Sequence, residues 1–240
     1  MYVCAEMAAE NQSKIIAFTP RELFVHRQRL RLLIIIMLAF LFGRATQASA
    51  RAHIHLSIPK AVVFDLDGCL WAPDMYMLWG GGAPFKLGKN GELVDCRGER
   101  VKMLGAVPEV LHELHTDAKW QSTVIAVASC TDEPSWADEC MNKFEVAPGL
   151  SIKEVIQREE IYKANKQKHL QSLSETTGIA LRDMLFFDNE RGNCRDVSSI
   201  GVSVAFVPDG VTALAWETAL DQFPSRDIIT VPSHRGPPVR

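Results

Sequence analysis

From Pro59 onward the chain alternates short apolar runs with helix-like segments, and this alternation constrains the fold more than any other feature. The apolar runs cover residues 61–64, 123–128, 184–187 and 202–207. Nearly continuous apolar runs separated by helices are typical of a parallel sheet that is covered by helices on both faces. The sequence therefore predicts an α/β fold, a doubly wound parallel sheet of the Rossmann type.

Helical spacing of apolar residues marks the segments between these runs. We expect helices over 107–117, 134–144, 165–177, 193–200 and 211–223. Pro108 and Pro134 fall in the first turns of two of them, where proline is tolerated, and Gly178 fits the end of a third. Residues 152–162 are compatible with either a helix or a strand.

A stretch rich in glycine, tryptophan and methionine, residues 71–102, separates the first expected strand from the first expected helix. Its Gly80-Gly81-Gly82 run and the turn-like Lys89-Asn90-Gly91 predict a loop with one hairpin. A connection of about 35 residues is short for a separate domain, so we expect a minimal cap, or none, over any site.

Composition narrows the class of protein. Hydrophobic residues make up 47% of the 240 residues and charged residues 23%, which is enough apolar material for a core. The formal net charge is -3, so the chain lacks the excess of positive charge that is typical of proteins that bind nucleic acid. The six cysteines form no CxxC pair, so a zinc site has little support and we expect free thiols.

Residues 1–50 have the character of a targeting segment. Basic residues precede an unbroken apolar run of eleven residues, Leu32 to Phe42, and the small residues Ala48-Ser49-Ala50 follow it. This is the layout of a secretory signal peptide, and the run is too short for a membrane span, which needs roughly 20 apolar residues. We expect four parts. They are a targeting segment (1–50), a linker (51–58), a folded domain (59–225) and a C-terminal tail (226–240).

The region before the apolar run is 31 residues long, whereas whole signal peptides have roughly 15–30 residues. The segment is therefore also compatible with a signal anchor or with the first half of a two-part organelle address, such as that of a plastid. We expect the secretory pathway or an organelle as the compartment, with the cytoplasm as the alternative. Contact with a membrane is expected only through this segment, if it is not cleaved.

Polar side chains follow three of the expected strands. Asp65 and Asp67 come after the first strand, Ser129 after the second and Asp188 after a later one. In such sheets ligands bind beyond the carboxyl ends of the strands, so these side chains are expected at one binding edge. Two carboxylates two residues apart repel each other, and a divalent cation such as Mg²⁺ would relieve this. A single Asp after a strand is more often a turn cap, but the whole set favours a metal site.

Four segments carry these residues in order along the chain. They are Phe64-Asp65-Leu66-Asp67-Gly68-Cys69-Leu70-Trp71, Ala128-Ser129-Cys130-Thr131, Lys166, and Phe186-Phe187-Asp188-Asn189-Glu190. In order and spacing they resemble the four motifs of the haloacid dehalogenase superfamily, of which the first is D-x-D-x-[TV] and the fourth an acidic pair after a strand. The resemblance runs from about Pro59 to Phe223 and implies a HAD-like fold.

A narrower resemblance rests on further segments. They are Asp95-Cys96-Arg97-Gly98, Val107-Pro108-Glu109-Val110-Leu111, Arg158-Glu159-Glu160-Ile161-Tyr162 and Phe186 through Asn193. With Leu70-Trp71 they resemble the small eukaryotic magnesium-dependent phosphatases, which are grouped with acid and protein-tyrosine phosphatases. This resemblance implies a Mg²⁺-dependent hydrolase of phosphate monoesters.

The resemblance also implies a role for each motif residue. Asp65 would attack phosphorus and form an aspartyl-phosphate, and Asp67 would protonate the leaving oxygen and then activate water. Ser129, with the backbone N–H of Cys130, would hold the phosphoryl oxygens. Lys166 would neutralise charge that develops in the transition state.

Mg²⁺ would be held by Asp65, the backbone carbonyl of Asp67 and the pair Asp188 and Asn189. Asn189 stands where the family has a second Asp, and a neutral amide would bind Mg²⁺ more weakly, in which case Asp188 would carry the contact. Cys69 replaces the usual Thr or Val.

Cys130 replaces an Arg that is common in relatives, which puts one phosphate or substrate contact in doubt. Lys163 and Lys168 lie close to Lys166, but the family's spacing of four residues from Tyr162 favours Lys166. Asp196 is at least as compatible with a surface helix position as with a further acidic site residue.

Two other functions compete with a phosphatase. The chain could be an inactive relative that binds a phosphorylated ligand or a protein partner, because Cys130 and Asn189 depart from the family motifs. The presence of both Asp65 and Asp67 argues against this alternative. A dehalogenase attacks carbon and usually lacks the second Asp, so Asp67 argues for phosphoryl transfer. An open site would suit a phosphosugar or a phosphoprotein as substrate.

Overall fold

The computed structural model describes residues 57–231. The expected targeting segment lies outside the described residues, as do most of the linker and the end of the tail. Within the described part of the chain, no helix is long and apolar enough to cross a membrane. The five cysteines of this part are all free thiols.

The centre of the fold is a six-stranded sheet with the strand order β12-β11-β10-β1-β6-β9. Its strands are β1 (Ala61–Phe64), β6 (Val124–Ser129), β9 (Arg158–Ile161), β10 (Met184–Asp188), β11 (Ser203–Phe206) and β12 (Ile229–Thr230). All neighbouring pairs run parallel. In β1, Phe64 is opposite Phe187 of β10 and Val127 of β6, so the carboxyl ends of the three central strands are level.

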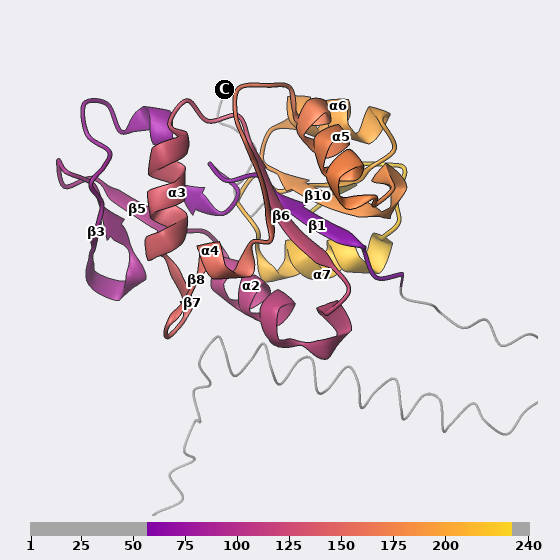
Figure 1. The fold of residues 1–240 in the computed structure, drawn as a ribbon, viewed down its shortest axis with the longest axis horizontal. Coiled ribbons are helices and arrows are strands. Elements are labelled where there is room, and N and C mark those ends of the chain that lie inside the picture. Colours follow the sequence, from indigo (N-terminus) through magenta and orange to yellow (C-terminus); the bar gives the residue numbers. More distant parts are fainter. Residues whose placement is uncertain (1–56, 232–240) are drawn as a thin grey trace, which may run out of the picture. The chain divides into compact units, whose positions relative to one another are not determined.

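Helices cover both faces of this sheet, with α2 (Val107–Thr116) and α7 (Ala213–Gln222) on one face and α5 (Lys166–Thr177) and α6 (Arg191–Ser199) on the other (Figure 1). Successive side chains of a strand point to opposite faces. Val62 and Phe64 accordingly belong to the core beneath α2 and α7, whereas Val63 packs in the core beneath α5 and α6. The expected doubly wound parallel sheet is therefore confirmed.

The start of α5 follows from its sequence. The side chain of Asn165 accepts a hydrogen bond from the backbone N–H of Gln167, which caps the first turn. Gly178 ends the helix with a φ of 73°, a left-handed conformation that glycine adopts without strain. This cap fixes Lys166 as the first residue of the helix, directly beside the end of the sheet.

The glycine-rich stretch after β1 is more ordered than expected. It forms a four-stranded antiparallel sheet with the order β2-β5-β4-β3, which lies beside α3 in Figure 1. The strands are β2 (Trp71–Ala72), β3 (Lys86–Leu87), β4 (Leu93–Val94) and β5 (Arg100–Met103). The expectation of a loop with one hairpin was wrong, because strands this short leave no readable alternation in the sequence.

The remaining elements are short. They are α3 (Pro134–Lys143), the hairpin of β7 (Glu145–Ala147) and β8 (Leu150–Ser151), α4 (Ile152–Val155), and the 3₁₀ helices η1 (Met75–Met77), η2 (Lys89–Gly91), η3 (Ala118–Trp120) and η4 (Leu181–Asp183). The ambiguous stretch 152–162 thus holds both a helix, α4, and a strand, β9. Strand β12 lies within the stretch assigned to the tail, and its Ile229 is buried opposite Ala205 of β11, so the sheet extends to Thr230.

Candidate active site

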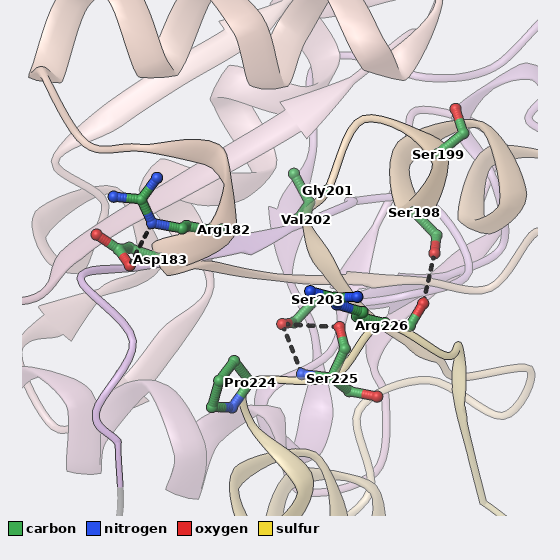
Figure 2. Close-up of a pocket in the computed structure, with 10 residues that line it drawn as sticks. All are labelled: Arg182, Asp183, Ser198, Ser199, Gly201, Val202, Ser203, Pro224, Ser225 and Arg226. Carbon is green, nitrogen blue, oxygen red and sulfur yellow. Dashed lines mark hydrogen bonds and ion pairs between the residues drawn. The ribbon is translucent and has the colours of Figure 1, made fainter.

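Two cavities lie at opposite edges of the main sheet. The larger, of about 600 Å³, is at the amino ends of the strands, where Ser203 begins β11 and Asp183 precedes β10. Figure 2 shows two of its serine hydroxyls bound within the protein, that of Ser203 to the backbone of Ser225 and that of Ser198 to the backbone of Arg226. It contains none of the candidate residues.

The smaller cavity, of about 150 Å³, lies at the carboxyl ends of β1 and β6, the edge where ligands bind in parallel sheets. Four of the candidate residues line it: Asp65, Asp67, Ser129 and Cys130. The expected convergence of strand ends is therefore present. We take this cavity as the candidate active site.

Lys166 links two of the strand ends. Its side chain is 1% exposed. The ammonium donates to Asp65 Oδ1 and to the carbonyl of Ala128, and it lies 3.7 Å from Asp188 Oδ2. Burial alone would lower the pKa of Lys166, but Asp65 and Asp188 outweigh it and raise that pKa. The lysine is therefore a fixed cation beside Asp65. Of the nearby lysines, Lys163 instead forms an exposed ion pair with Asp132.

Asp188 is fully buried at the end of β10. Its Oδ1 accepts a 2.7 Å hydrogen bond from the backbone N–H of Glu190, and Asn193 Nδ2 lies 3.3 Å from Oδ1 and 3.1 Å from Oδ2. Burial and the charge of Asp65 raise the pKa of Asp188 to about 7, against the opposing effect of Lys166. Two buried carboxylates thus share a single ammonium.

Asp67 is held by two hydrogen bonds from the segment that follows β1. Its Oδ1 accepts a 2.8 Å hydrogen bond from the indole N–H of Trp71, and its Oδ2 accepts one of 3.2 Å from the backbone N–H of Met75. Burial raises the pKa of Asp67 to about 7, although both hydrogen bonds act to lower it. A carboxyl with such a pKa can donate or accept a proton near neutral pH.

Ser129 ends β6 and is buried, with its Oγ accepting a 3.3 Å hydrogen bond from the backbone N–H of Thr131. Cys130 is half-buried at the cavity wall, and burial raises the pKa of its thiol, so it is a neutral group there. No arginine is among the described residues that line the cavity, and the cationic side chain that does line it is Lys163.

Asn189 packs against the turn after β1. A Cβ added to Gly68 would lie 2.3 Å from Asn189 Nδ2, so the glycine allows this approach. Asn189 Oδ1 is buried and has no hydrogen-bond partner among the described residues. Asp196 accepts a 3.0 Å hydrogen bond from Asn165 on the surface, where it supports the start of α5 rather than the cavity.

The sequence profile of the family described as Acid Phosphatase matches residues 57–226. The chain belongs to the acid phosphatase family. Human Magnesium-dependent phosphatase 1 is 34% identical over 170 residues, which cover 69% of this chain and 88% of that protein. A HAD-like hydrolase superfamily protein of Schizosaccharomyces pombe is 34% identical over 154 residues, which cover 62% of this chain and 86% of that protein. The expected membership in the haloacid dehalogenase superfamily is confirmed.

Among solved structures, this acid phosphatase family member is similar to the phosphatase domain in the N-terminal part of a Bacteroides fragilis protein, solved as a complex with Mg. The TM-score is 0.49 at 18% identity, and the match covers 74% of this chain and 44% of that chain.

Three groups that hold the candidate residues were missed by sequence reasoning. They are the indole of Trp71, the backbone N–H of Met75 and the side chain of Asn193. Trp71 and Asn193 both stand in segments that carry the resemblance to the phosphatases, and this was the signal that could have marked them as site residues. The contact of Met75 depends on the conformation of η1 and left no signal in the sequence.

Proposed function

We propose that the chain is a Mg²⁺-dependent phosphatase that hydrolyses phosphate monoesters through an aspartyl-phosphate at Asp65. The observation that carries this proposal is the ion pair between Lys166 and Asp65 in the cavity at the carboxyl ends of the strands. A nucleophile held beside a fixed cation suits attack on a dianionic phosphate. Membership in the acid phosphatase family supports the same activity.

The donor set fits Mg²⁺. Among the described residues no three His, Cys, Asp or Glu side chains form a group that could hold a metal ion, and the Asp67 carboxylate is bound by Trp71 and Met75. The ligands we propose are instead the carboxylates of Asp65 and Asp188, the backbone carbonyl of Asp67 and the unpartnered Oδ1 of Asn189. These are hard oxygen donors. Burial and, after it, the charge of Asp65 raise the pKa of Asp188, and a divalent cation would favour the ionised carboxylate there.

When bound, Mg²⁺ would draw negative charge from the phosphoryl oxygens. The chain's own residues perform the bond changes. An oxygen of Asp65 attacks phosphorus, the bond from phosphorus to the leaving oxygen breaks, and Asp67 gives its proton to that oxygen. Asp67 then takes a proton from water as the water oxygen attacks the phosphorus of the aspartyl-phosphate. Inorganic phosphate leaves, and Asp65 is again a carboxylate.

Ser129 and Lys166 bind rather than react. We assign the hydroxyl of Ser129 and the N–H of Cys130 to the phosphoryl oxygens, because both groups lie where β6 ends at the cavity. Lys166 holds Asp65 in place before attack and offsets charge on the phosphoryl group during it.

Hydrolysis of 4-nitrophenyl phosphate by the full chain tests this activity. We expect turnover that requires Mg²⁺ and is abolished by chelation. Full activity after exhaustive chelation would contradict the metal requirement. No turnover at any Mg²⁺ concentration would favour the alternative, an inactive relative that binds a phosphorylated ligand or protein.

For the substrate, we propose a phosphate carried by a bulky group, such as a phosphorylated protein side chain. Tyr76 lines the cavity together with Asp65 and is 62% exposed, so an exposed aromatic ring adjoins the nucleophile. Met77 and Trp79, which follow Tyr76 closely in the chain, are exposed as well. Such a surface suits a phosphotyrosyl group better than a small polar phosphosugar. Comparing kcat/KM for a phosphotyrosyl peptide with that for glucose 6-phosphate tests this, and a preference for the sugar would contradict it.

We further propose that residues 1–50 direct the protein to the secretory pathway or an organelle and are then removed. The basic run, the apolar run Leu32 to Phe42 and Ala48-Ser49-Ala50 support this. N-terminal sequencing of the protein from its native cells is the test. We expect a start within a few residues of Arg51, and an intact N-terminus on a cytosolic protein would contradict the proposal.

A further inference from the structure

His169 joins helix α5 to the ends of β6 and β9, although it has no part in the proposed chemistry. It lies one turn after Lys166 in α5 and is fully buried. Its Nε2 lies 2.9 Å from the carbonyl oxygen of Tyr162, and the two rings meet edge to face with centroids 4.4 Å apart. Because a carbonyl oxygen only accepts, Nε2 carries the proton and donates.

Tyr162 is itself bonded to the end of β6. Its backbone N–H donates a 3.1 Å hydrogen bond to the carbonyl of Ser129. Lys166 donates a hydrogen bond to the carbonyl of the preceding residue of β6, Ala128. Together these bonds form a closed path that runs from Ser129 through Tyr162 and His169 to Lys166 and back to β6. His169 is thus one of the links that hold the Lys166 helix at the end of β6.

Packing alone does not account for a histidine at this position. The second ring nitrogen, Nδ1, is buried and has no hydrogen-bond partner among the described residues. A buried acceptor without a partner lowers stability, and a phenylalanine or leucine would fill the volume without that cost. Burial lowers the pKa of His169 and the charge of Lys166 lowers it further, so the ring is neutral and Nδ1 carries no proton. What the histidine adds is the Nε2–H donor.

We propose that His169 is a positioning residue, whose hydrogen bond to Tyr162 holds the ammonium of Lys166 in register with Asp65 and Ser129. This inference rests on the proposed function, because it requires Lys166 to act on the phosphoryl group. Loss of the donor would let the first turn of α5 move relative to β6. The charge of Lys166 would then be misplaced in the transition state, where small displacements matter most.

The test compares three variants of the full chain with 4-nitrophenyl phosphate and Mg²⁺, with kcat, KM and thermal midpoint measured for each. His169→Phe keeps the ring volume and removes the donor. His169→Gln places an amide N–H near the position of Nε2. Ser174→Ala is the matched control, because Ser174 donates a 2.7 Å hydrogen bond to the Ile179 carbonyl at the far end of α5.

We expect His169→Phe to lower kcat by roughly tenfold or more while KM changes by less than about threefold, and His169→Gln to keep kcat within about threefold of the wild type. Ser174→Ala should lower the thermal midpoint without lowering kcat. An active wild type together with unchanged kcat in His169→Phe overturns this inference alone. The inference is also overturned if Ser174→Ala lowers kcat along with the thermal midpoint, because a loss of kcat would then follow from any destabilisation of α5. An inactive wild type overturns the proposed function and this inference with it.

If His169→Phe does not fold, His169→Asn takes its place. Asparagine carries its N–H near the position of Nδ1 and cannot reach the Tyr162 carbonyl in the same way. We then expect the Asn variant to lose roughly tenfold more kcat than the Gln variant. Equal kcat in the Asn and Gln variants overturns the inference.

Discussion

The indole N–H of Trp71 donates a 2.8 Å hydrogen bond to one carboxylate oxygen of Asp67, and the backbone N–H of Met75 donates to the other. Both oxygens of the proposed proton donor are therefore held by the segment that leads away from β1. Trp71 is fully buried and stacks on Phe144, so the indole cannot move independently of the core.

Replacing Trp71 by Phe should impair proton donation more than phosphoryl attack. The variant keeps an aromatic ring but loses the N–H that orients Asp67. We expect kcat to fall by roughly tenfold with an alkyl phosphate, whose poor leaving group needs a proton, and by much less with 4-nitrophenyl phosphate. Steady-state kinetics with the two substrates measures the difference.

Trp120→Phe provides the matched control for this prediction. Trp120 is also buried and its indole N–H also binds a carboxylate, Glu113, at 3.1 Å, but it lies outside the cavity. The Trp120→Phe variant should be less stable, but the ratio of its kcat values for the two substrates should be that of the wild type. If Trp71→Phe lowers both rates equally, as a general packing defect would, the assignment of Asp67 as proton donor is contradicted.

Stability without Mg²⁺ should fall as the pH rises from about 4 to about 7. Burial raises the pKa of Asp67 from 3.8 to about 7 and that of Asp188 likewise, so the folded chain keeps protons that the unfolded chain has lost. The protons that the folded chain keeps on Asp67 and Asp188 stabilise it at low pH, and this stabilisation is lost as the pH approaches 7. Each pKa unit corresponds to about 1.4 kcal/mol, or a thermal midpoint shift of roughly 3–6 °C.

Thermal melts across this pH range, with EDTA or with excess Mg²⁺, check the prediction. Mg²⁺ should raise the midpoint more at pH 8 than at pH 5, because it binds the ionised carboxylates of the folded chain. In EDTA, the thermal midpoint of Asp188→Asn should decrease less with rising pH than that of the wild type. A midpoint that rises with pH in EDTA, or a Mg²⁺ effect of equal size at both pH values, would be inconsistent with a buried carboxylate site.

Asn189→Asp should tighten Mg²⁺ binding. The unpartnered Oδ1 of Asn189 would become part of a charged carboxylate, which attracts a divalent cation more strongly than an amide does. We expect the Mg²⁺ concentration for half-maximal activity to fall by roughly tenfold. An unchanged half-maximal Mg²⁺ concentration would mean that, of the pair Asp188 and Asn189, only Asp188 is a ligand.

Gly68→Ala should destabilise the fold and disturb Asn189. Gly68 has a φ of 71°, and an added Cβ would lie 2.3 Å from Asn189 Nδ2. We expect a loss of about 1–3 kcal/mol beyond that of Gly178→Ala, which has a similar φ of 73° but nothing within 4 Å of the added Cβ. Chemical denaturation of both variants measures the difference, and equal losses would show that the contact with Asn189 costs nothing.

The sequence was sufficient for the four strands β1, β6, β10 and β11, because these are almost entirely buried on both faces. It did not reveal the edge strands β9 and β12, whose residues are partly exposed. Continuous apolar runs such as 61–64 and 184–187 are visible without any structure, and the polar residues that follow them must meet at one edge. That rule placed Asp65, Ser129 and Asp188 together. The family spacing from Tyr162 selected Lys166 over Lys163, and the structure joins Lys166 to Asp65.

The parts that the sequence did not predict depend on contacts between distant or very short segments. Strands β2 and β3 have two residues each, so no periodic pattern can reveal them. The turn of Asp67 toward Trp71 and Met75 depends on the backbone of η1. The contact of His169 with the Tyr162 carbonyl has no sequence signal, because it exists only once β9 and α5 are placed.

A covalent phosphoryl group on Asp65 tests the central claim most directly. The full chain is mixed with 4-nitrophenyl phosphate and Mg²⁺, quenched rapidly, and reduced with borohydride, which converts an aspartyl-phosphate into homoserine; the peptides are then sequenced by mass spectrometry. We predict homoserine at position 65, none without Mg²⁺ and none in Asp65→Asn, whose kcat should be lower by several orders of magnitude. Turnover with no modification at position 65, or near-normal kcat in a folded Asp65→Asn protein, would contradict the account.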